Sequence, residues 1–262
     1  MSCSIGQFTA VDDTADASWF IDFMDRTNAQ PEYARIRESL ITAMGPLSGR
    51  AVLDVGCGPG DDTREVAELV GPTGRVVGMD LSGAMVAEAR RQGGPVEFVP
   101  GDVHELPFPT ASFDAVRVKL VRIHSPEIDT ADDELVRVLR PGGRLAAFDF
   151  DIETFTLDHP DRTTTRAVLN FWADQHHRQG WCGRQTRRRF LARGLTDVTV
   201  VPHTVPTTYE LLRAVMDGPL AEAVALGVVD VSPQEWFAPL AEAAEQDLFF
   251  ASVGGYVVAA TR

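Results

Sequence analysis

The chain has 262 residues and a mass of 28.6 kDa, which is enough for one sizeable domain that buries its own core. A formal net charge of −14 at pH 7 opposes a phosphate backbone and disfavours nucleic acid as a partner or substrate. The three cysteines form no CxxC pair, so we expect no bound metal. There is no signal-peptide pattern and no apolar run near the roughly 18 residues of a membrane span, so we expect a cytoplasmic protein that does not associate with a membrane.

The first predicted elements are helical. Residues 1–18 are polar and rich in aspartate, and we expect them to be poorly ordered. In residues 19–44 the apolar side chains recur at intervals of three and four, which predicts two amphipathic helices interrupted near Pro31.

Short apolar strands then alternate with helices as far as residue 150. Strands are predicted at 51–55, 75–79, 96–99, 113–118 and 144–150, and helices at 61–70, 82–91 and about 130–139. Ser82 is a suitable N-cap for the second of these helices. This alternation predicts an α/β fold with a mostly parallel sheet covered on both faces.

The pattern changes after Asp151, where helices become longer and strands fewer. Helices are predicted at 162–179, 184–193, 209–226 and 233–247, and strands at 197–201 and 249–260. These helices and those near the N-terminus are expected to cover a substrate chamber.

A glycine-rich turn follows the first strand, where residues 52–60 read VLDVGCGPG. Such a turn brings bare backbone against a ligand at the carboxyl edge of a sheet, but NAD, FAD and phosphate sites use one too. The third small residue of the dinucleotide fingerprint is replaced here by Asp61. Asp54, Asp61 and Asp62 would repel a pyrophosphate and suit the sulfonium and ammonium groups of S-adenosylmethionine. This charge pattern favours S-adenosylmethionine as the cofactor.

Two further acidic residues end neighbouring strands. Asp80 lies about 20 residues beyond the glycines, where a carboxylate can accept hydrogen bonds from ribose hydroxyls. Asp102 ends the third strand, where an adenine amino group could be recognised, with Val103 or Leu106 against the ring. A helix cap for Asp80 and a turn role for Asp102 are the alternatives.

Four stretches resemble the class I methyltransferases, particularly the group that includes ubiquinone and menaquinone biosynthesis enzymes. They are LDVGCGPG (53–60), VVGMDLS (76–82), GDVHELPFPTASFDAV (101–116) and ELVRVLRPGGRL (134–145), in the family's order. The resemblance implies a doubly wound, Rossmann-like sheet of seven strands with the last one antiparallel. It also implies cofactor-binding roles for Asp54, Gly56, Gly58, Gly60, Asp80, Leu81, Asp102, Val103 and Lys119. We divide the chain into an N-terminal helical cap (1–45), an S-adenosylmethionine-binding core (46–152) and a segment of cap helices with the last two strands (153–262).

The segment after the fourth strand departs from many relatives, which have a sequence like ERVLQH. Here residues 119–124 read KLVRIH, so Lys119 replaces an acid while His124 is kept. A cation near a sulfonium is unfavourable unless it points outward or pairs with an anion. This departure keeps open a methyltransferase-like cyclase or other enzyme that retains the cofactor without transferring methyl, and a binding protein without catalysis.

Methyl transfer depends mainly on alignment of nucleophile, methyl group and sulfur. If the nucleophile must lose a proton, His124 is the best candidate base, with a packing or capping role as the alternative. We predict a methyltransferase of specialised metabolism, a monomer or homodimer, that acts on an O, N or C atom of a small organic molecule.

Substrate contacts are expected from aromatic side chains and from one strand end. The aromatic candidates are Tyr33, Phe155, Trp172, Trp181 and Trp236, with core packing as the alternative. Asp149, Asp151 and Glu153 alternate along the fifth strand and could orient a substrate, Asp151 above all, or bind a hard metal. At most one of His176 and His177 would face a pocket, and the arginines of 184–189 are expected to form a solvated or ion-paired helix face.

Overall fold

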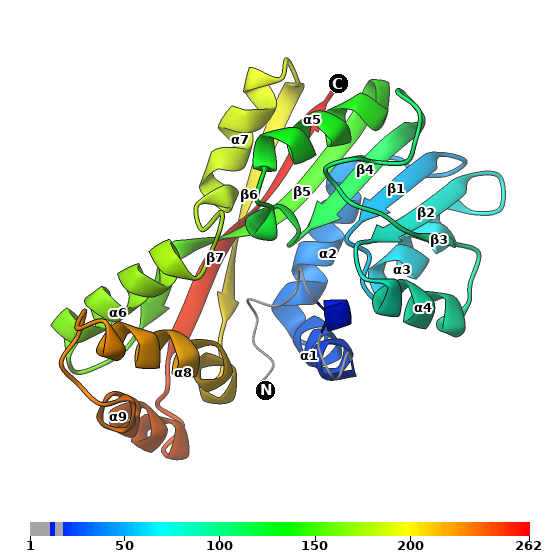
Figure 1. Ribbon diagram of the computed structural model, residues 1–262. Coiled ribbons are helices and arrows are strands. Elements are labelled where there is room, and N and C mark those ends of the chain that lie inside the picture. The colour runs from blue at the N-terminus through cyan, green and yellow to red at the C-terminus, as the bar shows by residue number, and fades with distance from the viewer. Residues whose placement is uncertain (1–10, 14–17) are drawn as a thin grey trace.

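The computed structural model describes residues 11–13 and 18–262, and its centre is a seven-stranded sheet with the order β3-β2-β1-β4-β5-β7-β6 (Figure 1). The strands are β1 (Ala51–Val55), β2 (Arg75–Asp80), β3 (Glu97–Pro100), β4 (Phe113–Lys119), β5 (Leu139–Leu157), β6 (Thr196–Pro206) and β7 (Ala251–Thr261). Neighbours from β3 to β5 are parallel, whereas β7 is antiparallel to both β5 and β6. The predicted doubly wound sheet with an antiparallel last strand is confirmed.

Helices cover both faces of this sheet. They are α1 (Ser18–Asn28), α2 (Pro31–Met44), α3 (Asp61–Val70), α4 (Gly83–Gln92), α5 (Ile128–Val138), α6 (Arg162–Gln175), α7 (Cys182–Ala192), α8 (Tyr209–Ala225) and α9 (Pro233–Glu245), with 3-10 turns η2 (Val11–Asp13) and η3 (Arg122–His124). Side chains alternate along a strand, so Val52 packs with α2 and α3 while Leu53 packs with α5 and α7. Most of residues 1–18, for which we predicted poor order, lies outside the described residues.

Strand β5 is much longer than the predicted 144–150. It continues to Leu157 through a register shift between Asp151 and Thr156 opposite β7. Its far end packs against α6, α8 and α9, which lie together at one end of the molecule in Figure 1. This end forms a helical cap with its own apolar core around Trp172 and Trp236. None of the helices in the described part of the chain is long and apolar enough to cross a membrane.

Helix α6 is shorter than predicted, because it ends at Gln175 rather than at residue 179. The following backbone turns away to bond other segments: the Gln179 N–H donates to the Ile123 carbonyl at 3.2 Å, and the Ile152 N–H donates to the Gly180 carbonyl at 2.8 Å. The two histidines therefore do not lie within a helix. His176 caps α6, and His177 lies in the loop of residues 176–181.

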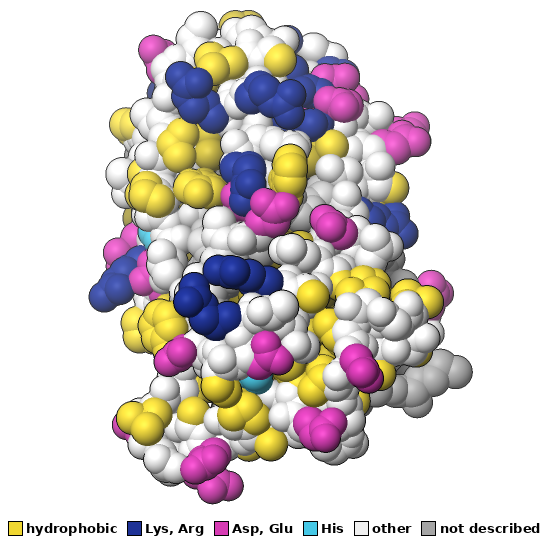
Figure 2. Space-filling view, turned by 90° about the vertical axis from the view of Figure 1, so that its left-hand side faces the viewer, with side chains coloured by type: hydrophobic (Ala, Val, Ile, Leu, Met, Phe, Trp, Pro, Cys, Tyr) yellow, Lys and Arg dark blue, Asp and Glu magenta, His cyan; other side chains and the backbone are white. Residues whose placement is uncertain are grey.

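Two of the four arginines within α7 form ion pairs. Arg184 bonds Asp151 and Glu153, and Arg189 bonds Asp129 at 2.7 Å. Figure 2 shows this side of the molecule, with basic and acidic side chains close together over much of its surface. The expectation of an ion-paired helix face is confirmed for these two arginines.

Candidate functional site

A cavity of about 540 Å³ opens at the carboxyl ends of β1, β2 and β4. One part of its wall comes from the sheet edge and contains Gly56, Gly58, Asp80, Leu81, Asp102, Val103 and Lys119. Another part comes from the cap and is largely apolar, with Ile152, Phe155, Trp172, Val205, Leu211 and Val215. We call these parts the strand-end half and the cap half. The volume is within the range of small-molecule sites.

The glycine loop is held tightly against the end of β2. Gly56 and Gly58 adopt φ values of 73° and 53°, in the left-handed region that favours glycine. The Gly56 N–H donates to the Met79 carbonyl at 2.7 Å, and a Cβ on Gly56 would lie 2.1 Å from Cγ2 of Val121. Bare backbone is therefore required where this loop forms the cavity wall.

Asp80 presents a half-buried carboxylate to the cavity. Its Oδ2 accepts from the Gly58 N–H at 2.8 Å, and its Oδ1 accepts from the Ser82 N–H at 3.0 Å. A carboxylate has about four acceptor positions, so it can still accept hydrogen bonds from a ribose. Burial, with the nearby Asp54 and Asp12, raises its pKa against the effect of the two amides. Ser82 caps α4 by accepting from the Met85 N–H, as predicted.

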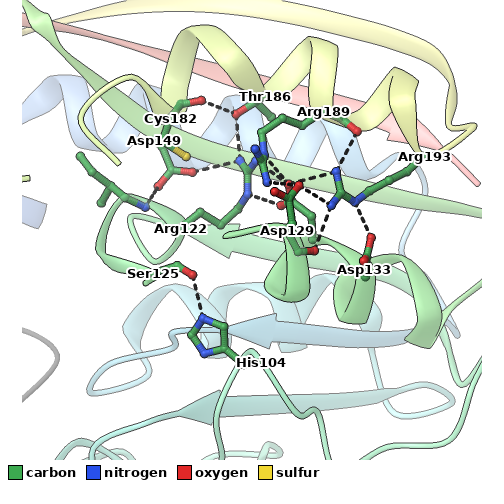
Figure 3. Close-up of polar contacts among 12 residues, drawn as sticks. His104, Arg122, Ser125, Asp129, Asp133, Asp149, Cys182, Thr186, Arg189 and Arg193 are labelled. Carbon is green, nitrogen blue, oxygen red and sulfur yellow. Dashed lines mark hydrogen bonds and ion pairs between the residues drawn. The ribbon is translucent and has the colours of Figure 1, made fainter. Parts of the chain in front are cut away.

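Asp102, His104 and Ser125 form a chain of hydrogen bonds at the cavity wall. His104 Nδ1 lies 2.5 Å from Asp102 Oδ1, and His104 Nε2 lies 2.7 Å from Ser125 Oγ, the contact drawn in Figure 3. Val103 beside them is buried and offers an apolar surface. Leu106, the alternative ring contact, packs instead in the core.

The acidic residues around the glycine loop are paired with buried cations. Asp54 is fully buried beneath the loop, where its carboxylate accepts from Arg117 at 2.7 Å and from Thr63 Oγ1 at 2.7 Å. Asp62 contacts both Arg117 and Lys119, whose Nζ lies 2.5 Å from Asp62 Oδ2. Burial opposes ionisation of Asp62, but the two cations hold its pKa well below the usual range.

The structure corrects three of the predictions. Asp54 is not in the cavity wall, because its side chain is buried beneath the loop, and Gly60 is not in the wall either but is the N-cap of α3. The argument from an uncompensated acidic loop was also wrong, because Arg117 and Lys119 balance Asp54 and Asp62. Lys119 lines the cavity as expected and is paired with an anion.

A buried arginine fixes the segment that carries His124. Arg122 donates to Asp132 at 2.7 Å, to Thr186 at 2.8 Å and to Asp149 at 3.2 Å (Figure 3). Asp149 also accepts from the Ile123 N–H at 3.2 Å, and burial raises its pKa to about 6. This network joins η3 to β5, α5 and α7, so the backbone of η3 is tied to three neighbouring elements.

His124 lines the cavity and is half-buried beside the sheet edge. Burial and the nearby Arg178 lower its pKa to about 4. The imidazole is therefore neutral near pH 7 and can accept a proton, although as a weak base.

Two of the four substrate-binding candidates line the cavity. Tyr33 and Trp172 are in its wall, but Asp151 and Trp181 are not. Asp151 is bonded to Arg184, and the Trp181 ring is 46% exposed beneath the same guanidinium. Asp151 and Trp181 thus lie outside this cavity, and their side chains are in contact with Arg184 instead.

Of the other residues considered for substrate contact, only Phe155 is in the cavity wall, and Trp236, Asp149 and Glu153 are not. Phe155 lines the cavity, whereas Trp236 is buried against His159. The carboxylates of Asp149 and Glu153 are bonded to Arg122 and Arg184. Among the described residues no cluster of histidine, cysteine and acidic side chains could hold a metal ion.

Several wall residues were not predicted. Met24, Thr27 and Asn28 come from α1, and Asn28 Oδ1 accepts from Lys119 Nζ at 3.3 Å. The apolar stripe of α1 predicted a helix, but it did not predict that this helix lines the cavity. His104 and Ser125 carried no distinguishing pattern.

Comparisons with known proteins agree on one family. A family described as a methyltransferase domain matches residues 52–143. An uncharacterised 37.1 kDa protein of a Streptomyces fradiae transposon is 35% identical over 250 residues, covering 92% of this chain and 70% of that protein. The ubiquinone/menaquinone biosynthesis C-methyltransferase UbiE of Hahella chejuensis is 39% identical over 120 residues, covering 44% of this chain and 48% of that enzyme. The match thus spans about half the length of this relative.

A solved structure shows the same fold over nearly the whole chain. The S-adenosylmethionine-dependent methyltransferase from Aquifex aeolicus aligns with a TM-score of 0.53 at 17% identity, covering 94% of this chain and 99% of that one. The cap helices and the core sheet are both included in an alignment of this extent.

Proposed function

We propose a small organic molecule as the methyl acceptor of this chain, which belongs to the class I S-adenosylmethionine-dependent methyltransferases. S-adenosylmethionine is therefore the expected cofactor, and it supplies an electrophilic methyl group on a sulfonium. The observation that carries the proposal is one cavity of about 540 Å³ that joins the strand-end half to the apolar cap half. A cavity of this size and lining suits a small apolar molecule beside the cofactor.

The strand-end half supplies the groups that would hold the cofactor. Gly56 and Gly58 allow backbone contact, and Asp80 has free acceptor positions for ribose hydroxyls. Asp102 and Val103 would receive the adenine, and Leu81 would cover the nucleoside from the exposed side. Lys119 is neutralised by Asp62, so it adds no unpaired positive charge beside the sulfonium.

His124 is proposed to accept a proton or a hydrogen bond from the methyl acceptor. Its lowered pKa, about 4, keeps it neutral in the physiological range, which suits a site that also binds a cation. We further propose that the accepting atom is O, N or C. The same proposal includes a cytoplasmic location, a monomer or homodimer, no nucleic-acid partner and a role in specialised metabolism.

Replacement of Asp80 tests the cofactor assignment. D80N should weaken S-adenosylmethionine binding at least about tenfold, because a charged acceptor of two hydrogen bonds is lost. Calorimetry would measure the affinity, with E97Q as the control at a solvent-exposed pair between Glu97 and Arg75. Unchanged affinity in D80N, or no binding by the unmodified protein, would contradict the assignment.

Turnover separates the two enzyme classes that the sequence leaves open. Formation of S-adenosylhomocysteine in the presence of a small-molecule acceptor would support methyl transfer. Cofactor binding with conversion of the substrate but no S-adenosylhomocysteine would instead identify the alternative, a cyclase-like enzyme that retains the cofactor.

A further inference from the structure

His177 brings a polar atom into the cap half of the cavity, where Arg178 and Thr207 are the other polar wall residues. It lies in the loop of residues 176–181, and its ring packs edge-on against Trp172 with centroids 4.8 Å apart. His124 also lines the cavity and is close enough to affect the charge state of His177. An imidazole of the cap and one of the sheet edge therefore face the same space.

The loop that carries His177 is fastened to η3. The Gln179 N–H donates to the Ile123 carbonyl at 3.2 Å, and Gln179 Nε2 donates to the Ser125 carbonyl at 3.2 Å. These bonds reach the residues on either side of His124 in the sequence. They keep the two imidazoles in a fixed relation before any ligand arrives, which reduces the ordering cost of binding.

The Nε2 atom of His177 is buried and has no hydrogen-bond partner among the residues that the structure describes. The Nε2 atom of His176 is likewise buried without a hydrogen-bond partner among these residues, but it lies 3.3 Å from Glu222, and His176 is not in the cavity wall. An unsatisfied buried nitrogen costs free energy, and such groups are rare in folded proteins. A ligand group that pairs with this atom would remove that cost.

Hydrogen-bonding capacity narrows the class of the ligand group that pairs with His177. Burial, with the neighbouring His124 and His176, lowers the pKa of His177 to about 4, so its ring is neutral near pH 7 and carries one N–H donor and one acceptor nitrogen. A hydroxyl both donates and accepts, so it can pair with Nε2 in either tautomer of the ring.

We propose that His177 is a substrate-binding residue whose Nε2 pairs with a neutral hydroxyl group on an otherwise apolar methyl acceptor. This inference rests on the proposed function and names the substrate class for the same cavity. The apolar walls around Trp172, Phe155 and Leu211 bind the body of the molecule, while His177 recognises its hydroxyl.

Two matched probes test this in the protein saturated with S-adenosylhomocysteine. Equilibrium dialysis should show that 2-naphthol binds at least about tenfold more tightly than 2-methylnaphthalene. H177F, which keeps a ring of similar size, should abolish the preference for the hydroxyl. H176F is the control and should keep it. Equal affinities for the two probes, or persistence of the preference in H177F, would overturn the proposal.

A second readout measures the effect of the probes on the wild-type protein itself. In wild-type protein with nitrogen-15 histidine, 2-naphthol should shift the Nε2 resonance of His177 and 2-methylnaphthalene should not, with H177Q used to assign the signal. A Nε2 resonance that responds to neither probe would count against the proposal. Cofactor affinity measured in parallel separates the two conclusions, because loss of S-adenosylmethionine binding contradicts the family function, whereas loss of the hydroxyl preference contradicts only the role of His177.

Discussion

Gly56 shows how a single residue controls the strand-end half of the cavity. It combines a φ of 73° with a backbone bond to Met79, and Val121 fills the position that a side chain would need. Gly45 has a nearly equal φ of 77°, but nothing lies within 4 Å of its Cβ position. A side chain at Gly45 would therefore meet only backbone strain, whereas a side chain at Gly56 would also collide with Val121.

G56A should lose cofactor affinity and more stability than G45A. Both variants carry the cost of a left-handed alanine, about 1–2 kcal/mol, and G56A adds the displacement of Val121. Urea unfolding and calorimetry with S-adenosylmethionine would measure the two effects. The explanation fails if G56A and G45A lose equal stability and both bind normally.

At the scale of elements, buried ion pairs connect β4 with β1 and α3. Arg117 on β4 is fully buried and bonds Asp54 on β1 and Asp62 on α3. Each charge is tolerated in the interior because its partners are in place, and removal of one partner leaves the other uncompensated. The pairing holds α3 at the end of β1, where the glycine loop begins.

D54N should lower the free energy of unfolding by about 3–5 kcal/mol, because Arg117 keeps its charge and loses a principal partner. Thr63 would lose a charged acceptor as well. Urea unfolding would measure this, with D61N as the control at a residue whose side chain is 46% exposed. A loss below about 1 kcal/mol in D54N would show that the pair contributes little.

Most elements could be predicted because their signals are local. Ala51–Val55 and Asp61–Val70 match β1 and α3 residue for residue, and Ser82 caps α4 as expected. The ends of β5 and α6 could not be predicted, since the extension of β5 depends on β7, about 100 residues later, and α6 stops where its loop bonds η3. The division at residues 45 and 152 remains a proposal.

The site residues that could be predicted are also those that belong to local sequence motifs. Gly56, Gly58, Asp80 and Asp102 belong to strand-end motifs, and all four lie in the cavity wall. Asp54 was misplaced because the charge that balances it comes from Arg117, which lies 63 residues away in sequence. No sequence pattern pairs two such positions.

Two half-buried histidines, His124 and His177, influence the stability of the whole molecule. The pKa values of His124 and His177 lie near 4, below the usual 6.5, so the unfolded chain binds more protons between these pH values. The stability of the fold with both imidazoles neutral is fully present above pH 6.5. It decreases as the pH falls toward 4, because protonation of these histidines then favours the unfolded chain. Asp149 acts in the opposite direction, because burial raises its pKa to about 6 and the folded state keeps its proton.

A double variant isolates this effect. Between pH 7 and pH 4.5, wild-type protein should lose about 2 kcal/mol more unfolding free energy per histidine than H124F/H177F, in which Asp149 still titrates. Urea unfolding at the two pH values provides the comparison. Equal losses in both proteins would mean that the imidazoles titrate normally.

β7 lies between β5 and β6 in the sheet and follows both of them in the sequence. Neither β5 nor β6 can therefore complete its hydrogen bonds at this edge until β7 has been synthesised. During synthesis on the ribosome, the edge of β5 stays open while about 100 further residues emerge, and only then can Ala251–Thr261 insert. An open, apolar strand edge is prone to pair with other chains. The nascent protein is thus most exposed to aggregation, and most dependent on chaperones, shortly before its synthesis reaches β7.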